Sequence, residues 1–354
     1  MPEAARARQA LNIGAMTTTT VERARERPTA LNEPWSLGGI EIPNRVVLAP
    51  LAGIGNWFVR LQAKRYGAGL AVSEMVSSFA VHYGNQRTCT ELLRIHPDEH
   101  PVSVQLFGSD PDVMASAAER VAAAGADLID INMGCPVPKV CKTGAGAALL
   151  ADPARAVALA RAAGRGSGLP ITVKLRTGLR AGDLAGATIA RALAHEGAVA
   201  GLAVHPRAAV QRHSGRPDYA LARSLVDELP VPVLITGGLR TAAQAREAFE
   251  LTGADAVLLA RGSLGNPWLF AELLGKRDGE PTRAEILAEL DWVIERAAEH
   301  LGEERATHYL RKFYPWYIER LGGTRREQAA LQAALQSAPT RREARALLLG
   351  DGRP

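Results

Sequence analysis

The sequence predicts an α/β fold: a TIM (β/α)8 barrel followed by a C-terminal all-helical domain. Eight short apolar, β-branched runs recur between residues 46 and 260, most of them separated by Ala-rich segments of helical period. Runs that are apolar on both faces are typical of buried parallel strands. Eight β/α units in about 225 residues match the barrel in number and length. From about residue 282 onward only helical patterns remain.

The expected elements follow one another in order along the chain. The eight strands are Val46–Pro50, Leu70–Ser73, Val102–Leu106, Leu128–Asn132, Ile171–Lys174, Gly201–His205, Val233–Thr236 and Ala256–Ala260. Helix patterns between them include Asp110–Ala124, Pro153–Ala163, Asp183–His195, Tyr219–Glu228 and Thr241–Leu251. Gly-Ala pairs at 67–68, 125–126 and 253–254 fit helix ends that lead into the next strand. A doubly wound sheet also alternates strands and helices, but eight evenly spaced units without a dinucleotide fingerprint favour the barrel.

Three regions are expected on this basis. Residues 1–33 are polar and lack apolar periodicity, which predicts a flexible extension in which Met16 is a second candidate start. Residues 34–275 would form the barrel domain and residues 282–350 the helical domain. A capping box of Thr282 with Glu285 predicts the start of the first tail helix. Further tail helices are expected over Arg305–Leu321, Arg325–Gln336 and Thr340–Leu349.

Composition narrows the class of protein. Hydrophobic residues make up 47% and charged residues 22%, as in globular proteins. Three cysteines in 354 residues do not fit a disulfide scaffold and indicate a reducing compartment. No apolar stretch is long enough for a membrane span or a secretory signal, so a cytoplasmic protein is expected. The net charge of +5, with ten basic against four acidic residues from Arg305 onward, indicates a preference for polyanions.

The carboxyl ends of the barrel strands are where chemistry is expected. The third strand presents Gln105, and the fourth leads into a long Gly- and Pro-rich loop that carries Cys135. Lys174 and Arg176 lie on one side of the fifth strand by its period of two, and His205 ends the sixth. Turns with glycines follow the seventh and eighth strands, in ITGGLR and LLARGSLG. Such turns are the usual phosphate site of these barrels.

Cys135 is the most informative of these residues. The MGCP sequence places it between a flexible glycine and a rigid proline, which directs the thiol into the barrel mouth. A thiolate nucleophile would need a neighbouring base, whereas a thiol acid stays protonated near neutral pH with a pKa of about 8.5. Cys141, six residues on, has no further Cys or His cluster, so no metal site is expected, and Cys89 is taken as structural. Lys174 fits a Schiff-base amine, a phosphate contact, a cation beside an electron-rich ring or an ion pair.

Taken together, these strand ends resemble the tRNA-dihydrouridine synthases, flavin enzymes that reduce uridine in tRNA. The resemblance extends from Asn44 to Phe270, and the tail segment RKFYPWY is similar to the family's C-terminal domain. The motifs that carry it are LAPLAG with Phe58 and Arg60, YGAGLAVSEMVSS, VSVQLFG, DINMGCPVPKVCKTGAGAALL, ITVKLRTG and GADAVLLARGSLGNPWLF.

The resemblance implies FMN bound across the barrel mouth and reduced by NADPH, with NADH left open. Hydride would pass from the flavin to uracil C6 while Cys135 gives a proton to C5. Asn132 and Arg176 would hold the uracil edge or its neighbouring phosphate. The helical tail would bind the tRNA backbone, and the target base would leave its stack to reach the cavity. The chain is expected to act as a monomer and to need no metal ion. The implied FMN-binding residues are Pro50, Leu51 and Ala52 beneath the flavin; Gln105, Lys174 and His205 at the ring or ribityl chain; and Gly237, Gly238, Leu239, Ala260 and Arg261 at the phosphate.

The chain departs from the family pattern at three places. Leu51 stands where many relatives have Met, Gly237-Gly238-Leu239 where Asn-Gly-Asp is common, and Ala208 where Thr is frequent. Backbone N–H contacts survive such changes, so the expected effect is on FMN affinity rather than on function. Two other functions stay open: an FMN barrel that reduces a small molecule, like relatives of dihydroorotate dehydrogenase or ene-reductases, and a catalytically silent tRNA-binding relative. The sequence does not specify which uridine is reduced.

Overall fold

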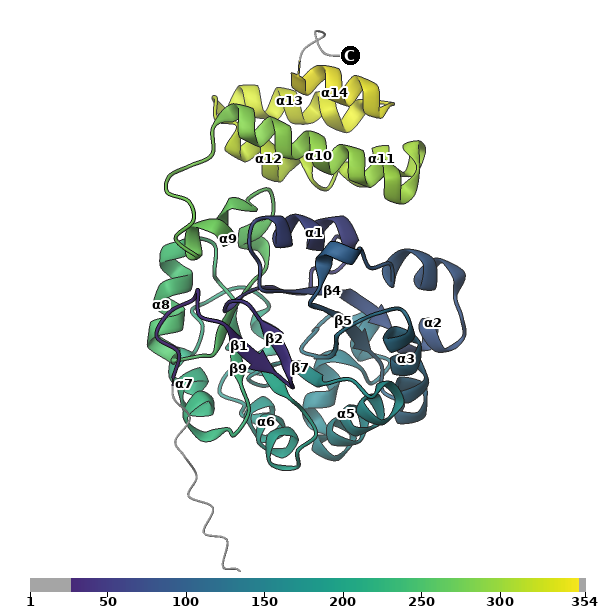
Figure 1. Cartoon of the computed structure of the whole chain (residues 1–354), viewed down its shortest axis with the longest axis vertical. Coiled ribbons are helices and arrows are strands. Elements are labelled where there is room, and N and C mark those ends of the chain that lie inside the picture. The colour runs from purple at the N-terminus through teal and green to yellow at the C-terminus, as the bar shows by residue number, and fades with distance from the viewer. Residues whose placement is uncertain (1–26, 350–354) are drawn as a thin grey trace, which may run out of the picture.

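Eight parallel strands close into a barrel, which confirms the predicted fold class (Figure 1). The computed structural model describes residues 27–349; the predicted extension at 1–33 falls mostly on residues 1–26, which lie outside this range. The strands run around the barrel in chain order, with the last, β10, pairing with the first, β3. They are β3 (Val46–Leu48), β4 (Leu70–Ser77), β5 (Val102–Phe107), β6 (Leu128–Met133), β7 (Ile171–Arg176), β8 (Gly201–His205), β9 (Val233–Thr236) and β10 (Ala256–Leu259).

A short antiparallel hairpin, which the sequence reading missed, contributes to the barrel's inner core. It consists of β1 (Trp35–Leu37) and β2 (Ile40–Ile42). Leu37 and Ile42 are fully buried and belong to the same core as Val47 and Leu128 from the barrel strands. With three residues in each strand, the hairpin is too short to show a clear alternation of apolar and polar residues.

Helices cover the outside of the barrel, and the five predicted ones are confirmed within a few residues. Side chains of Asp110, Asp152, Asp218 and Thr241 cap the starts of α3, α5, α7 and α8. Gly253 ends α8 in the left-handed conformation, as the Gly-Ala pattern predicted. The barrel helices are α1 (Trp57–Arg65), α2 (Ser78–His82), α3 (Pro111–Ala123), α4 (Pro138–Cys141), α5 (Pro153–Ser167), α6 (Ala185–His195), α7 (Tyr219–Glu228), α8 (Ala242–Thr252) and α9 (Trp268–Leu273).

The tail is all helical and begins at the predicted capping box of Thr282 with Glu285. The single helix predicted over 305–321 was wrong, because the chain turns between Leu310 and Tyr314. Pro315 has no N–H to donate to the carbonyl of Arg311, so one continuous helix would lose a bond at this point. The tail helices are α10 (Arg283–Leu301), α11 (Glu303–Leu310), α12 (Tyr314–Arg320), α13 (Arg325–Ser337) and α14 (Arg341–Leu349).

The tail stacks on one end of the molecule, above α1 and α9 (Figure 1). Helix α1 joins it to the barrel, since buried Trp57 and Phe58 share one core with Val293 of α10. Side-chain hydrogen bonds also join α1 to the tail. The Gln62 side chain donates to Glu289 at 2.8 Å and to the Tyr317 hydroxyl at 2.9 Å. The tail is therefore held against the barrel by direct contacts, in addition to the chain segment that connects α9 to α10.

Candidate active site

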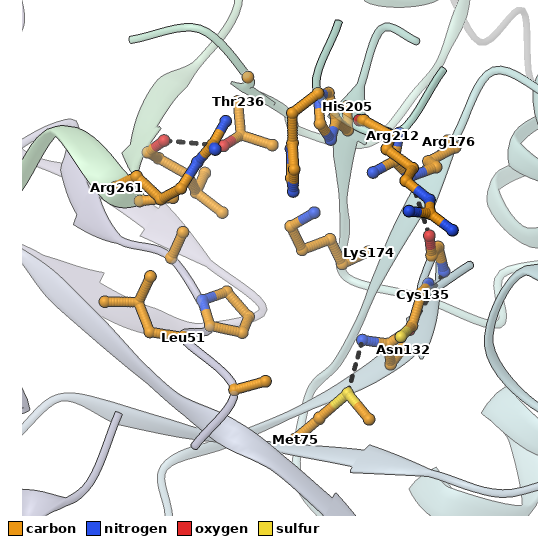
Figure 2. Close-up of a pocket in the computed structure, with 18 of the residues that line it drawn as sticks. Leu51, Met75, Asn132, Cys135, Lys174, Arg176, His205, Arg212, Thr236 and Arg261 are labelled. Carbon is orange, nitrogen blue, oxygen red and sulfur yellow. Dashed lines mark hydrogen bonds between the residues drawn. The ribbon is translucent and has the colours of Figure 1, made fainter. Parts of the chain in front are cut away.

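A cavity of about 660 Å³ opens at the carboxyl ends of the barrel strands (Figure 2). Every residue assigned to the site from sequence lies in its wall, although these residues come from the ends of seven different strands. They are Pro50, Leu51, Ala52, Gln105, Asn132, Cys135, Lys174, Arg176, His205, Gly237, Gly238, Leu239, Ala260 and Arg261. The geometry brings the set together; the individual roles remain predictions.

One wall of the cavity is apolar and comes from the loop after β3, which includes Leu51. Buried Arg60 of α1 holds this loop, donating from Nη1 to the Gly55 carbonyl at 3.0 Å. Its Nε pairs at 2.5 Å with Glu99, which is also fully buried. Lys312 of the tail donates to the carbonyl of Gly53 at 3.2 Å. The apolar wall thus depends on contacts from both the barrel and the tail.

The opposite side of the cavity is strongly basic. Burial and, next, the positive charge of Arg176 lower the pKa of Lys174 to about 8, against the opposing effects of Asp130 and Cys135. In Figure 2 the Lys174 side chain extends into the cavity between the apolar wall and Cys135. An ammonium group held in this way has a high free energy without an anion, and a negatively charged ligand in the cavity would stabilise it.

Arg176 ties two loops of the mouth together. Its Nε donates to the Gly134 carbonyl at 2.9 Å, and its Nη1 donates to the carbonyls of Arg212 at 2.8 Å and Ala208 at 3.2 Å. Burial, and next the charge of Arg207, lower the pKa of Arg176 to about 10. The guanidinium remains charged at neutral pH and fixes the Cys135 loop to the loop after β8.

His205 is neutral in this setting. Burial lowers its pKa strongly, and the charges of Lys174, Arg176 and Arg207 lower it further. The Nη1 of Arg207 lies 3.1 Å from Nε2 of His205. Since a guanidinium only donates, Nε2 accepts and the ring proton resides on Nδ1. His205 can therefore donate a hydrogen bond from Nδ1 at neutral pH.

Cys135 lies in the loop between β6 and α4, with its thiol at the cavity wall. Its backbone N–H donates to Asn132 Oδ1 at 2.9 Å, and its carbonyl accepts from Ala147 N at 2.9 Å and from the Cys141 thiol at 3.3 Å. Cys89, Cys135 and Cys141 are free thiols. Within residues 27–349, no group of three or more His, Cys, Asp or Glu side chains is arranged to hold a metal ion. Cys141 thus supports the backbone of the loop that presents Cys135.

The turns after β9 and β10 form a cradle with the properties of a phosphate site. Gly237 and Gly238 have φ values of 107° and 88°, and a Cβ on Gly237 would lie 2.4 Å from Cδ2 of His205. Arg261 stands beside them, and no carboxylate among the described residues pairs with its guanidinium. Burial and the neighbouring charge of Arg240 lower the pKa of Arg261. Exposed backbone and an unpaired guanidinium fit a bound phosphate.

The sequence reading missed several residues of the wall. Trp316 of α12 lines the cavity, so the tail contributes directly to the site. Arg212 and His213 come from the loop after β8, and Met75 from β4. Trp316 falls in RKFYPWY, a segment that carries the family resemblance but no signal of a place in the cavity. Arg212 and His213 follow AVHPR without a periodic pattern.

A second cavity, of about 620 Å³, adjoins the first and extends toward the tail. The two cavities share Arg240, Arg261 and Trp316, and the second also contacts Arg320 of α12. Glu280, which pairs with Arg320, and Glu319 also line this second cavity. A polar hollow therefore continues from the barrel mouth to the junction with the helical tail. Separately, no helix within the described part of the chain is both long and apolar enough to cross a membrane.

Comparisons of the sequence with known proteins identify a family. The sequence model of the dihydrouridine synthase family (Dus) matches residues 47–348. The chain is 38% identical to tRNA-dihydrouridine synthase B of Pseudomonas aeruginosa over 298 residues, 83% of this chain and 89% of the relative. It is 33% identical to the probable tRNA-dihydrouridine synthase 1 of Synechocystis sp. over 319 residues, covering 88% and 89%.

Solved structures share the fold at much lower identity. A morphinone reductase variant in complex with tetrahydroNAD aligns with a TM-score of 0.52 and 16% identity, over 73% of this chain and 94% of that chain. A histamine dehydrogenase from Rhizobium sp. aligns with a TM-score of 0.53 and 14% identity, over 70% and 48%. These likenesses support the barrel fold alone.

Proposed function

This chain belongs to the dihydrouridine synthase family, and from that premise we propose that it reduces the C5=C6 bond of specific uridines in tRNA to 5,6-dihydrouridine, in the cytoplasm, with FMN and NADPH. The family membership makes the chain a flavin-dependent oxidoreductase. The observation that carries the finer proposal is the composition of the cavity: an apolar wall, a partly buried lysine, a phosphate cradle and a loop thiol surround one space.

The residues of the cavity fit FMN. Leu51 and its neighbours would lie under the ring, and the glycine turns with Arg261 would hold the phosphate. Lys174 would face the electron-rich part of the ring, where an anion stabilises its buried ammonium. Gln105 and His205 would donate hydrogen bonds to the ring or ribityl chain. Gly237-Gly238-Leu239 offers backbone donors only, which supports a phosphate held by N–H groups and Arg261.

Cys135 would act as the acid. When bound and reduced by NADPH, FMN supplies a hydride to C6 of the uracil. The Cys135 thiol then gives one proton to C5 and regains it from solvent. The bonds from the loop backbone to Asn132 and Ala147 hold the thiol at the cavity wall. Arg176, fixed to carbonyls of two loops, would keep positive charge beside the incoming nucleotide.

The tRNA would reach the mouth along the second cavity and the helical tail. Within residues 34–275 the barrel would hold FMN, and residues 282–350 would form the RNA-binding part. Arg305, Arg320, Arg341 and Arg345 pair with carboxylates. Exposed Arg325, Arg326 and Arg342 do not form an ion pair within the described chain, so they remain available to phosphates.

Purified protein tests this function directly. It should be yellow, oxidise NADPH, and form dihydrouridine in tRNA that lacks this modification, as measured by mass spectrometry. NADPH oxidation without dihydrouridine in any tRNA, but with turnover of a small unsaturated compound, would instead indicate a small-molecule reductase. A colourless protein that binds tRNA would indicate a silent relative.

A further inference from the structure

A chain of buried hydrogen bonds leads from the barrel interior to the Cys135 loop. Asp130 of β6 is 3% exposed and accepts from the Thr172 hydroxyl and from Gln105 Nε2, both at 2.6 Å. Gln105 Oε1 in turn accepts from Asn132 Nδ2 at 2.9 Å. Asn132 Oδ1 accepts the backbone N–H groups of Cys135 at 2.9 Å and of Gly134 at 3.2 Å.

The polarity of this chain follows from chemistry. Burial raises the pKa of Asp130, whereas the hydrogen bonds from Gln105 and Thr172 and the charge of Lys174 favour its ionised form. An ionised carboxylate only accepts, so Gln105 must turn its NH2 group toward Asp130 and its oxygen toward Asn132. Asn132 must then turn its NH2 group toward Gln105, which leaves its oxygen to face the loop. Backbone N–H groups only donate, so this is the orientation that the loop requires. If the Asn132 amide were turned the other way, its NH2 group would face the backbone N–H groups of Gly134 and Cys135, and donors would face donors.

We propose that Asp130 is a positioning residue that sets the orientation of the Gln105 and Asn132 amides and thereby holds the Cys135 loop. Gln105 is fully buried and Asn132 is 9% exposed, so water does not readily replace a broken bond in the chain. The consequence for loop geometry is independent of the reaction. Only its consequence for turnover rests on the proposed function.

A reversal of polarity tests this assignment. In an Asn132→Asp variant, the second carboxylate oxygen would face Gln105 Oε1, and Gln105 could not turn without facing Asp130. Adding Asp130→Asn removes this conflict, since the new amide can donate to Gln105 Oε1 and Gln105 can donate to the new carboxylate. Asp130→Asn alone should be tolerated, because its oxygen can accept from Gln105 while its NH2 group donates to the Thr172 hydroxyl.

The readout is the rate at which iodoacetamide alkylates Cys135 in the purified full-length protein at pH 8.5, with Cys89 in the same molecule as reference. Asn132→Asp should raise this rate at least tenfold, and the double variant should return it to within about threefold of wild type. An unchanged rate in Asn132→Asp, or a double variant no closer to wild type than the single, would overturn the assignment.

A second pair keeps the test independent of Asn132. Thr172→Val alone should change the Cys135 rate little, because Asp130 still accepts from Gln105. Combined with Asp130→Asn it should change the rate strongly. The NH2 group introduced at position 130 then lacks the Thr172 hydroxyl as its acceptor and competes for the side-chain oxygen of Gln105. Additive effects of the two substitutions would contradict the proposal. Dihydrouridine formation by the same variants is measured separately, so that failure of the reaction and failure of the positioning role are distinguished.

Discussion

Trp316 of the tail and Gly265 of the barrel lie in direct contact. A Cβ on Gly265 would stand 2.7 Å from the backbone carbonyl carbon of Trp316, and Gly265 has a φ of 60°. Only glycine accepts both the conformation and this approach. The loop after β10, which carries Arg261, is thereby pressed against α12, and the tail forms part of the cavity wall. Removing the tail would therefore damage the site, in addition to any loss of the RNA binding proposed for the tail.

Glu289 should be the main polar anchor of the tail. It is 5% exposed and accepts from Gln62, Arg65 and the Tyr66 hydroxyl. Glu289→Gln removes the charge that pairs with Arg65 and forces the Tyr66 hydroxyl to reverse its hydrogen bond, so we expect a loss of about 2 kcal/mol in unfolding free energy. Urea unfolding measures it. The control is Glu280→Gln, a highly exposed partner of Arg320 that should cost less than about 0.5 kcal/mol; equal losses would contradict this account.

Gly237→Ala should weaken FMN binding. Its Cβ would lie 2.4 Å from the His205 ring, at a φ of 107° that disfavours any side chain. The ring or the turn must move, and both are assigned to the cofactor site. We expect at least a tenfold rise in the FMN dissociation constant, measured by fluorescence on reconstitution. The same substitution at Gly275, where φ is 67° and the added Cβ would meet open space, controls for backbone strain, and an equal effect there would refute the contact argument.

Lys174→Met should stabilise the FMN-free protein at pH 7. A pKa lowered from 10.5 to about 8 means that folding disfavours the charged form. The penalty, about 3 kcal/mol, is fully present below pH 8 and disappears as pH rises toward 10.5. Unfolding free energies of variant and wild type should therefore converge between pH 8 and 10. A gain that does not change with pH would show that packing, rather than charge, is responsible. The variant should also retain FMN poorly.

Arg325 and Arg326 should bind tRNA through its phosphates. Replacing both with Ala should raise KM for tRNA about tenfold at 0.1 M salt and flatten its salt dependence, with kcat nearly unchanged. The matched control replaces Arg161 and Arg191 on α5 and α6, two exposed arginines paired with Glu196 and Glu228. Equal effects of both pairs would indicate a general charge effect. No effect at α13 would remove these residues from the interface.

The barrel was predictable because its signals are local and repeated. Strands buried on both faces, capped helices and glycine helix ends each leave a pattern in the sequence. Of helix α1 only the end was predicted, from Gly67-Ala68, because the helix carries Arg60, Gln62 and Lys64 among its apolar residues. Arg60 and Gln62 are nevertheless buried, satisfied by Glu99 and Glu289 from distant segments. Only tertiary contacts explain polar residues at such positions.

The site was largely predictable because barrel topology places strand ends together. Residues of the cavity wall that do not come from strand ends were missed. The main one is Trp316, whose position depends on how the tail packs against the barrel. Asp130 could have been found, since it precedes Asn132 by two residues and therefore lies on the same side of β6. Its bonds to Thr172 and Gln105 depend on register between three strands, which a single sequence does not specify.

The most direct test of the central claim is a map of dihydrouridine, position by position, in tRNA from a strain that lacks this protein. We predict loss at one or a few positions, restored by the wild-type chain and by Cys141→Ala but not by Cys135→Ala. Unchanged dihydrouridine at every position would contradict the proposed reaction. Full restoration by Cys135→Ala would contradict the assignment of Cys135 as the acid.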